Sequence, residues 1–71
     1  MESPNYRIEV FKYGGNAPLM QYKAVLYHGN AVIDTAFNYS AAQVVRDLSA
    51  HPAQYSPGAT VAVVDLTGEV L

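Results

Sequence analysis

The chain has 71 residues, of which 51% are hydrophobic, with a formal net charge of −2 and no cysteine. This length allows one small domain near the lower limit for a self-sufficient core, and the hydrophobic content excludes a disordered chain. The absence of cysteine excludes disulfides and thiolate metal sites. Four basic residues against six acidic ones argue against a basic nucleic-acid surface and against a dense acidic stripe that imitates DNA.

The N-terminal region predicts no targeting segment. Residues 1–10, MESPNYRIEV, lack a basic stretch followed by an apolar run, and the apolar runs elsewhere are too short to span a bilayer. We therefore expect a cytoplasmic protein with no membrane partner. We also expect a single domain over residues 1–71, with residues 1–5 forming a frayed lead-in.

An aromatic and β-branched run, YRIEVFKY, predicts the first strand over residues 6–13. Alternation places Tyr6, Ile8 and Val10 on one side of this strand. The other side carries the side chains that we expect to stay outside the core: Arg7, Glu9, Phe11 and Tyr13. A loop over residues 14–18 follows.

Gly29 and Asn30 predict a two-residue turn between strands over residues 19–28 and 31–37. Glycine in the first position favours a type II′ turn. A regular register then pairs Tyr27 with Val32, Leu26 with Ile33, and Val25 with Asp34. It separates an apolar face from a mixed one. The apolar face holds Met20, Tyr22, Ala24, Leu26, Ile33, Thr35 and Phe37, and the mixed face holds Gln21, Lys23, Val25, Tyr27, Val32, Asp34, Ala36 and Asn38.

Helical spacing begins after Ser40, which is a favourable N-cap with Gln43 three residues later in capping-box position. An apolar stripe predicts the buried side of this helix. We expect the helix to end near Ala50 or His51, because Pro52 disfavours its continuation. The stripe consists of Ala41, Val44, Val45 and Leu48.

The nearly continuous apolar run over residues 60–66 predicts a central strand, buried on both faces or half-covered by the helix. A turn over 65–68 and a short fifth strand over 69–71 complete the order β-β-β-α-β(-β). The fold class that we predict is α+β, a two-layer sandwich with one helix packed on an antiparallel or mixed sheet.

Catalytic patterns are missing from the sequence. His28 and His51 lie far apart without a ligand-type spacing, the serines lack a nucleophile motif, and the acidic residues do not gather on one predicted face. A chain of this size also has difficulty enclosing a substrate pocket. We therefore expect a protein that is not an enzyme and that uses neither cofactor nor metal.

A single helix covers one face of the predicted sheet and leaves the other face open. Tyrosines mixed with a few charges are typical of protein-binding patches. Two alternatives remain: the aromatics serve cross-strand packing, or the C-terminal segment or a bulge covers them. Base stacking on such a sheet is disfavoured by the missing basic rim. The candidate protein-binding residues are Phe11, Tyr13, Tyr27, Val25 and Val32, with Arg7, Glu9, Lys23 and Asp34 at their rim.

In size and architecture this short, cysteine-free, slightly acidic α+β domain resembles the small inhibitor proteins of phages and mobile elements, anti-CRISPR proteins among them. The resemblance rests on no motif and therefore transfers no functional residue. It implies steric, non-catalytic binding to a large bacterial complex in the host cytoplasm. The alternatives are a homo-oligomeric accessory domain or an antitoxin-like module, followed by a nucleic-acid-binding sheet. For the inhibitor, and for the homo-oligomeric or antitoxin-like alternative, the partner is another protein chain, foreign or identical.

Overall fold

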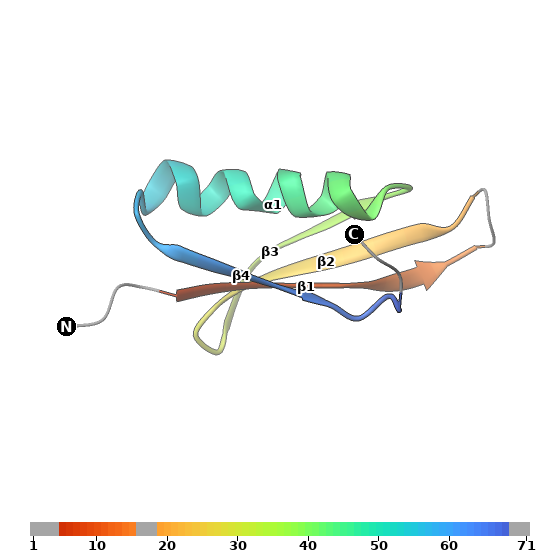
Figure 1. Ribbon diagram of the computed structural model, residues 1–71, viewed down its shortest axis with the longest axis horizontal. Coiled ribbons are helices and arrows are strands. Elements are labelled where there is room, and N and C mark those ends of the chain that lie inside the picture. Colours follow the sequence, from red (N-terminus) through yellow and green to blue (C-terminus); the bar gives the residue numbers. More distant parts are fainter. Residues whose placement is uncertain (1–4, 16–18, 69–71) are drawn as a thin grey trace.

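The computed structural model describes residues 5–15 and 19–68 and shows a four-stranded mixed sheet with one helix packed on one face (Figure 1). This arrangement confirms the predicted α+β sandwich. The predicted fifth strand over 69–71, the loop residues 16–18 and residues 1–4 of the lead-in lie outside the described residues. The elements are β1 (Asn5–Gly14), β2 (Gln21–His28), β3 (Ala31–Asn38), α1 (Ala41–Tyr55) and β4 (Thr60–Asp65).

The strands lie in the order β3-β2-β1-β4. β1 pairs with β2 in antiparallel and with β4 in parallel orientation, and β2 pairs with β3 in antiparallel orientation. The prediction that residues 60–66 form a central strand is therefore wrong, because β4 occupies an edge. Val61 and Val63 remain 36% and 46% exposed. An apolar run indicates that the side chains of a strand can be buried, but it does not indicate how many strands pair with it.

The core lies between α1 and the two central strands. Ile8, Val10, Leu26 and Val44 are fully buried, and Leu48 is 2% exposed. This pattern confirms the buried side predicted for the first strand and the apolar stripe of the helix, in which Val45 is partly buried. Within the described ranges, no helix is long and apolar enough to cross a membrane.

The β2–β3 hairpin begins as predicted and then departs from the regular register. Gly29 has φ 64°, as the first position of a type II′ turn requires, and Tyr27 pairs with Val32. A bulge then shifts the ladder, so that Leu26 lies opposite Asp34 instead of Ile33. Because side chains alternate along a strand, this single extra residue exchanges the two faces of β3 beyond the turn.

The exchange corrects the predicted faces of β3. Ala36, rather than Phe37, shares the helix side with Ala24, and Ala36 packs against the core while Phe37 is 46% exposed. Two opposed alanines leave room for α1 to approach the sheet, where a phenylalanine would hold it away. The bulge therefore places the small side chain under the helix and the large one on the opposite face.

Both ends of α1 differ in detail from the sequence prediction. Ser40 caps the helix, since its hydroxyl accepts a hydrogen bond from the Gln43 amide at 3.3 Å. The Gln43 side chain, however, donates to Asp47 at 2.7 Å and does not close a capping box. The expected end near residues 50–51 is wrong, because α1 continues through Pro52 to Tyr55. Proline removes one helical hydrogen bond, but burial of the Pro52 ring in the interior offsets that loss.

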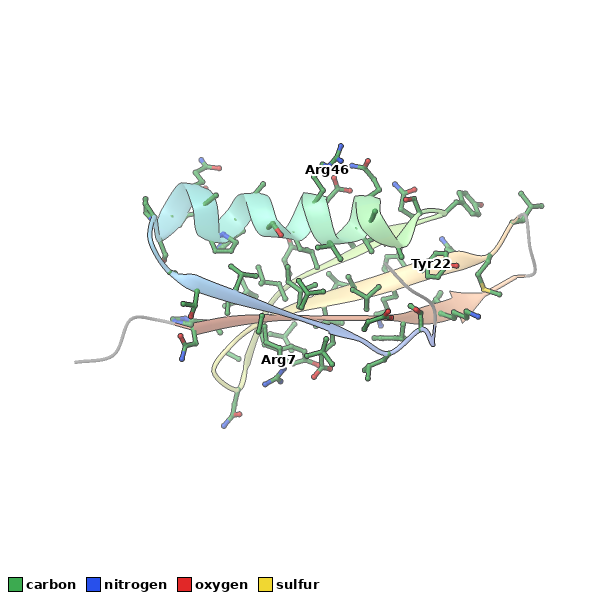
Figure 2. The ribbon with its side chains drawn as sticks, viewed as in Figure 1. Arg7, Tyr22 and Arg46 are labelled. Carbon is green, nitrogen blue, oxygen red and sulfur yellow. The ribbon has the colours of Figure 1, made fainter. Side chains whose placement is uncertain are left out.

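The burial of Leu48 predicts a large loss of stability on truncation. We expect Leu48→Ala to lower the free energy of unfolding by about 2–5 kcal/mol, because the substitution removes buried methyl groups and leaves a cavity. Urea denaturation followed by circular dichroism measures this change. Arg46→Ala on the solvent side of α1 (Figure 2) is the matched control, and we expect it to change stability by less than about 0.5 kcal/mol. Equal effects of the two variants would contradict the packing of α1 described here.

Candidate protein interface on the helix-free face

The side of the sheet opposite α1 is covered by side chains of β1, β2 and β3 that point away from the helix. Figure 2 shows Arg7 on this side, below the sheet in that view. The strand pairings place the others on the same side, since residues directly opposite each other share a face. We call this surface the open face: Arg7, Glu9, Phe11, Tyr13, Lys23, Val25, Tyr27, Val32, Thr35 and Phe37.

Three aromatic rings surround one ammonium group on the open face. Phe11, Lys23 and Phe37 form a row across β1, β2 and β3. Lys23 Nζ lies 5.7 Å from the ring centroid of Phe11, 5.4 Å from that of Tyr13 and 5.5 Å from that of Phe37. The Tyr13 and Phe37 rings meet edge to face at 5.0 Å. We call these four residues the lysine–aromatic cluster.

The side chains of the lysine–aromatic cluster contact one another without a partner. Each cation–π contact at an exposed site contributes roughly 0.5–1 kcal/mol, and three rings share the same ammonium group. Tyr13 and Phe37 nevertheless remain 56% and 46% exposed. The cluster is therefore an aromatic surface that a second molecule can reach.

A second group of contacts lies along the same face toward the other end of β1. The Arg7 guanidinium carbon lies 4.5 Å from the Tyr27 ring centroid, and Arg7 Nε lies 3.0 Å from Glu9 Oε2. Both charged side chains are partly exposed, at 42% and 28%. Because both side chains reach water, the ion pair adds little to stability, and in the structure it places the guanidinium group beside the Glu9 carboxylate.

Val25 lies between these two groups and is only 8% exposed. It pairs with Glu9 on one side and with Thr35 on the other. Val25 has the predicted orientation on the open face, but its neighbours already cover most of its side chain. Val25 supports the open face from below, whereas Val32, at 61% exposed, is accessible on it.

The bulge in β3 changes which residues belong to the open face. The regular register predicts Asp34 at the rim, but Asp34 lies opposite Leu26 on the helix side of the sheet, and its carboxylate accepts a hydrogen bond from the Thr35 amide at 2.8 Å. Phe37 and Thr35, for which that register predicts the core side, occupy the open face instead. The sequence of β3 contains no signal for this exchange, since Ala36 lies opposite Ala24 only after the bulge has shifted the register.

The structure places His28 and His51, which are far apart in the sequence, near the same ring, that of Tyr6. The Tyr6 ring stacks on His28 with a centroid distance of 4.5 Å and lies 6.5 Å from His51. The His51 ring in turn lies 4.7 Å from that of Tyr55. A hydrogen bond of 2.8 Å joins the hydroxyl groups of Tyr6 and Ser56. These contacts link the beginning of β1 to the end of α1, which is a structural role.

Within the described ranges, no group of three histidine, aspartate or glutamate side chains is arranged to hold a metal ion. No protein-family model, curated protein or solved structure matches the chain. Arguments about function therefore rest on the residues of this chain. The feature that distinguishes them is the open face, with its exposed rings and two partly exposed cations.

The lysine–aromatic cluster predicts an unusual magnetic environment for Lys23. Its terminal methylene protons lie near three ring systems, so we expect their proton resonances to be shifted upfield in the NMR spectrum. Phe37→Leu removes one ring and should move these resonances part of the way back. The shift of the same methylene group in an unstructured lysine peptide is the reference. Lys23 resonances at the position of a free lysine side chain would contradict the cluster.

Proposed function

We propose that this chain is a non-catalytic protein-binding module that contacts its partner through the open face. The observation that carries the proposal is the lysine–aromatic cluster: three rings and an ammonium group, ordered by mutual contacts, on a sheet face without a covering helix. Aromatic side chains and arginine contribute most of the binding free energy in many protein interfaces.

Pre-ordering of the side chains supports this proposal. Binding normally requires that flexible side chains lose rotamer freedom, at roughly 0.5–1.5 kcal/mol for each one. Lys23 and Arg7 are long and flexible, but each already rests on an aromatic ring. A partner therefore meets a surface whose most mobile groups are largely fixed. This property favours affinity without requiring a large area.

Charge on the open face favours a partner with acidic groups. Arg7 and Lys23 supply two positive charges against the single carboxylate of Glu9, because the bulge has moved Asp34 to the other side. The chain as a whole carries a net charge of −2. This contrast in sign orients the molecule as it approaches a negatively charged surface and contributes to partner choice and association rate.

The most concrete form of the proposal is a phage-type inhibitor that sterically blocks a bacterial defence complex such as a CRISPR-Cas effector. The small size of the chain, its α+β architecture and an exposed, rigid contact face support this form. A steric blocker requires neither an active site nor a cofactor. It requires only a surface that remains bound over a functional site of its target.

Substitution of the two most exposed rings tests the role of the open face. We expect Tyr13→Ser combined with Phe37→Ser to preserve the circular dichroism spectrum, because both side chains are about half exposed, and to abolish partner capture. Gln43→Ala combined with Arg46→Ala on α1 is the matched control and should capture as the unchanged chain does. The measurement compares the proteins that the three forms retain from bacterial lysate, with and without nuclease treatment. Equal retention by all three forms would place the interface elsewhere, and retention that nuclease removes would indicate nucleic acid.

The inhibitor form has a separate test in living cells. A bacterial strain whose CRISPR-Cas system restricts a phage should permit plaques when it expresses the unchanged chain. The variant with serine at positions 13 and 37 should restore restriction, while the α1 control should not. If strains with each of the main effector types still restrict the phage when they express the unchanged chain, the inhibitor form is contradicted. The capture experiment then remains the test of the more general binding role.

A further inference from the structure

The edge strand β4 carries apolar side chains on the same face of the sheet as the core, but α1 covers them only in part. Val61 and Val63 lie opposite Tyr6 and Ile8 of β1. Tyr6 and Ile8 are 6% and 0% exposed, while Val61 and Val63 are 36% and 46% exposed. The helix packs over β1, β2 and β3 and contacts β4 least. The core-side residues of β1 are therefore buried, whereas those directly opposite on β4 are exposed to water.

Among the described residues, β4 pairs with a strand on one side only, and its other side presents backbone hydrogen-bonding groups. The Leu66 amide donates to the Val10 carbonyl of β1 at 2.8 Å. Successive residues of a strand direct their backbone groups to opposite sides. The groups of Ala62 and Val64 therefore point toward β1, and those of Val61 and Val63 point outward from the free edge of the sheet.

The opposite edge of the sheet is protected against such pairing. On β3 the bulge interrupts the ladder beside Leu26, and the Asp34 carboxylate accepts a hydrogen bond from the Thr35 amide at 2.8 Å. Bulges and charged side chains are the usual devices that keep an edge strand from pairing with another chain. Over residues 60–64, β4 has neither device, since this stretch contains no charge, no proline and no irregularity in its pairing.

We propose that a second copy of this chain pairs with β4 in antiparallel orientation, around a two-fold axis that stands perpendicular to the sheet and passes midway between the two Ala62 residues. Val61 then lies opposite Val63 of the second copy, and Val63 opposite its Val61. Both residues direct backbone groups outward, so each such pair exchanges two hydrogen bonds. The result is a continuous eight-stranded sheet with both helices on the same side.

Charge placement selects this register. With the axis at Ala62, Asp65 lies opposite Ala59 of the second copy, and the two Asp65 carboxylates are about 20 Å apart, beyond the screening length of about 10 Å at 0.1 M salt. With the axis at Val63, each carboxylate would instead lie beside Val61 of the other copy. Ala62 is the centre of the uncharged stretch over residues 60–64, so the axis at this residue overlaps the whole stretch with its copy.

Self-pairing also completes the cover of the core face. The exposed sides of Val61 and Val63 pack against the same valines of the second copy, in the space that neither helix reaches. A 71-residue chain gains from such an interface because its own core is small. The contact is one strand wide and lies near the lower limit of specific interfaces, so we expect a dissociation constant on the order of micromolar.

Sedimentation velocity of the full chain over a range of concentrations tests the dimer. We expect a reversible monomer–dimer equilibrium, weakened at least tenfold by Val63→Lys. Val63 is half exposed, so the introduced lysine reaches water in the monomer and should preserve the fold. Ile33→Lys is the matched control, since Ile33 is 37% exposed on the opposite edge strand, and it should leave the equilibrium unchanged. A monomer at all concentrations up to about a millimolar, or equal effects of the two lysines, would overturn the proposal.

Hydrogen exchange identifies the edge directly. The amides of Val61 and Val63 should gain protection as the concentration rises, while those of Ala62 and Val64 should be protected throughout. Protection of Val61 and Val63 in the dilute monomer would show that the chain itself covers the edge, and would overturn the proposal.

The register has its own test. Val61→Glu and Val63→Lys should each weaken self-association, but an equimolar mixture should form a heterodimer in which the introduced charges lie opposite each other. A mixture that associates no better than the single variants would contradict the axis at Ala62. Because the open face is on other strands, the variant with serine at positions 13 and 37 should still dimerise. The failure of this inference and the failure of the proposed function are therefore distinguishable.

Discussion

A single helix is too narrow to cover a four-stranded sheet, and this limit determines which surfaces the molecule exposes. Packing of α1 against β1 and β2 buries Ile8, Leu26 and Val44 completely and supplies most of the apolar burial that stabilises so short a chain. Among the described residues, two regions lie beyond the reach of α1 and remain partly exposed: the opposite face of the sheet, and the outer strand β4. The two proposed interfaces are these two uncovered regions.

The two regions differ in chemistry and therefore suit different partners. The open face is aromatic and cationic, with its rings around Lys23, and two copies of it would carry the same sign of charge. The β4 edge is uncharged over residues 60–64 and complementary to itself around Ala62. We therefore propose a foreign, acidic surface as the partner of the open face and a second copy as the partner of the edge. In the resulting dimer both open faces lie on the same side, so a repeated or extended target would meet two contact surfaces.

Local patterns predicted the parts of the fold that local physics controls. The turn at Gly29, the cap at Ser40 and the stripe of Val44 and Leu48 each follow from a few neighbouring residues, and the structure confirms them. The errors arose where tertiary contacts decide. Alternation alone could not reveal the bulge that brings Ala36 under the helix, and the composition of β4 could not reveal that it has a neighbour on one side only.

The same distinction explains which residues of the open face could be predicted from the sequence. The positions of Phe11, Tyr13 and Tyr27 could be predicted because β1 and the first part of the hairpin alternate regularly. Phe37 was missed because it lies beyond the bulge, although it completes the lysine–aromatic cluster. The physical reason for the bulge is the approach of α1, which requires small side chains beneath it. No pattern within β3 itself contains that information.

Accessibility of individual side chains to a soluble paramagnetic relaxation agent tests the central claim, that α1 covers one face of the sheet and leaves the other open. The account predicts strong relaxation of the Phe37, Tyr13 and Val32 side chains and weak relaxation of Leu26 and Ala36. Protection of Phe37 as strong as that of Leu26, together with exposure of Ala36, would contradict the claim, because it would place the phenylalanine beneath the helix and remove the cluster from the open face.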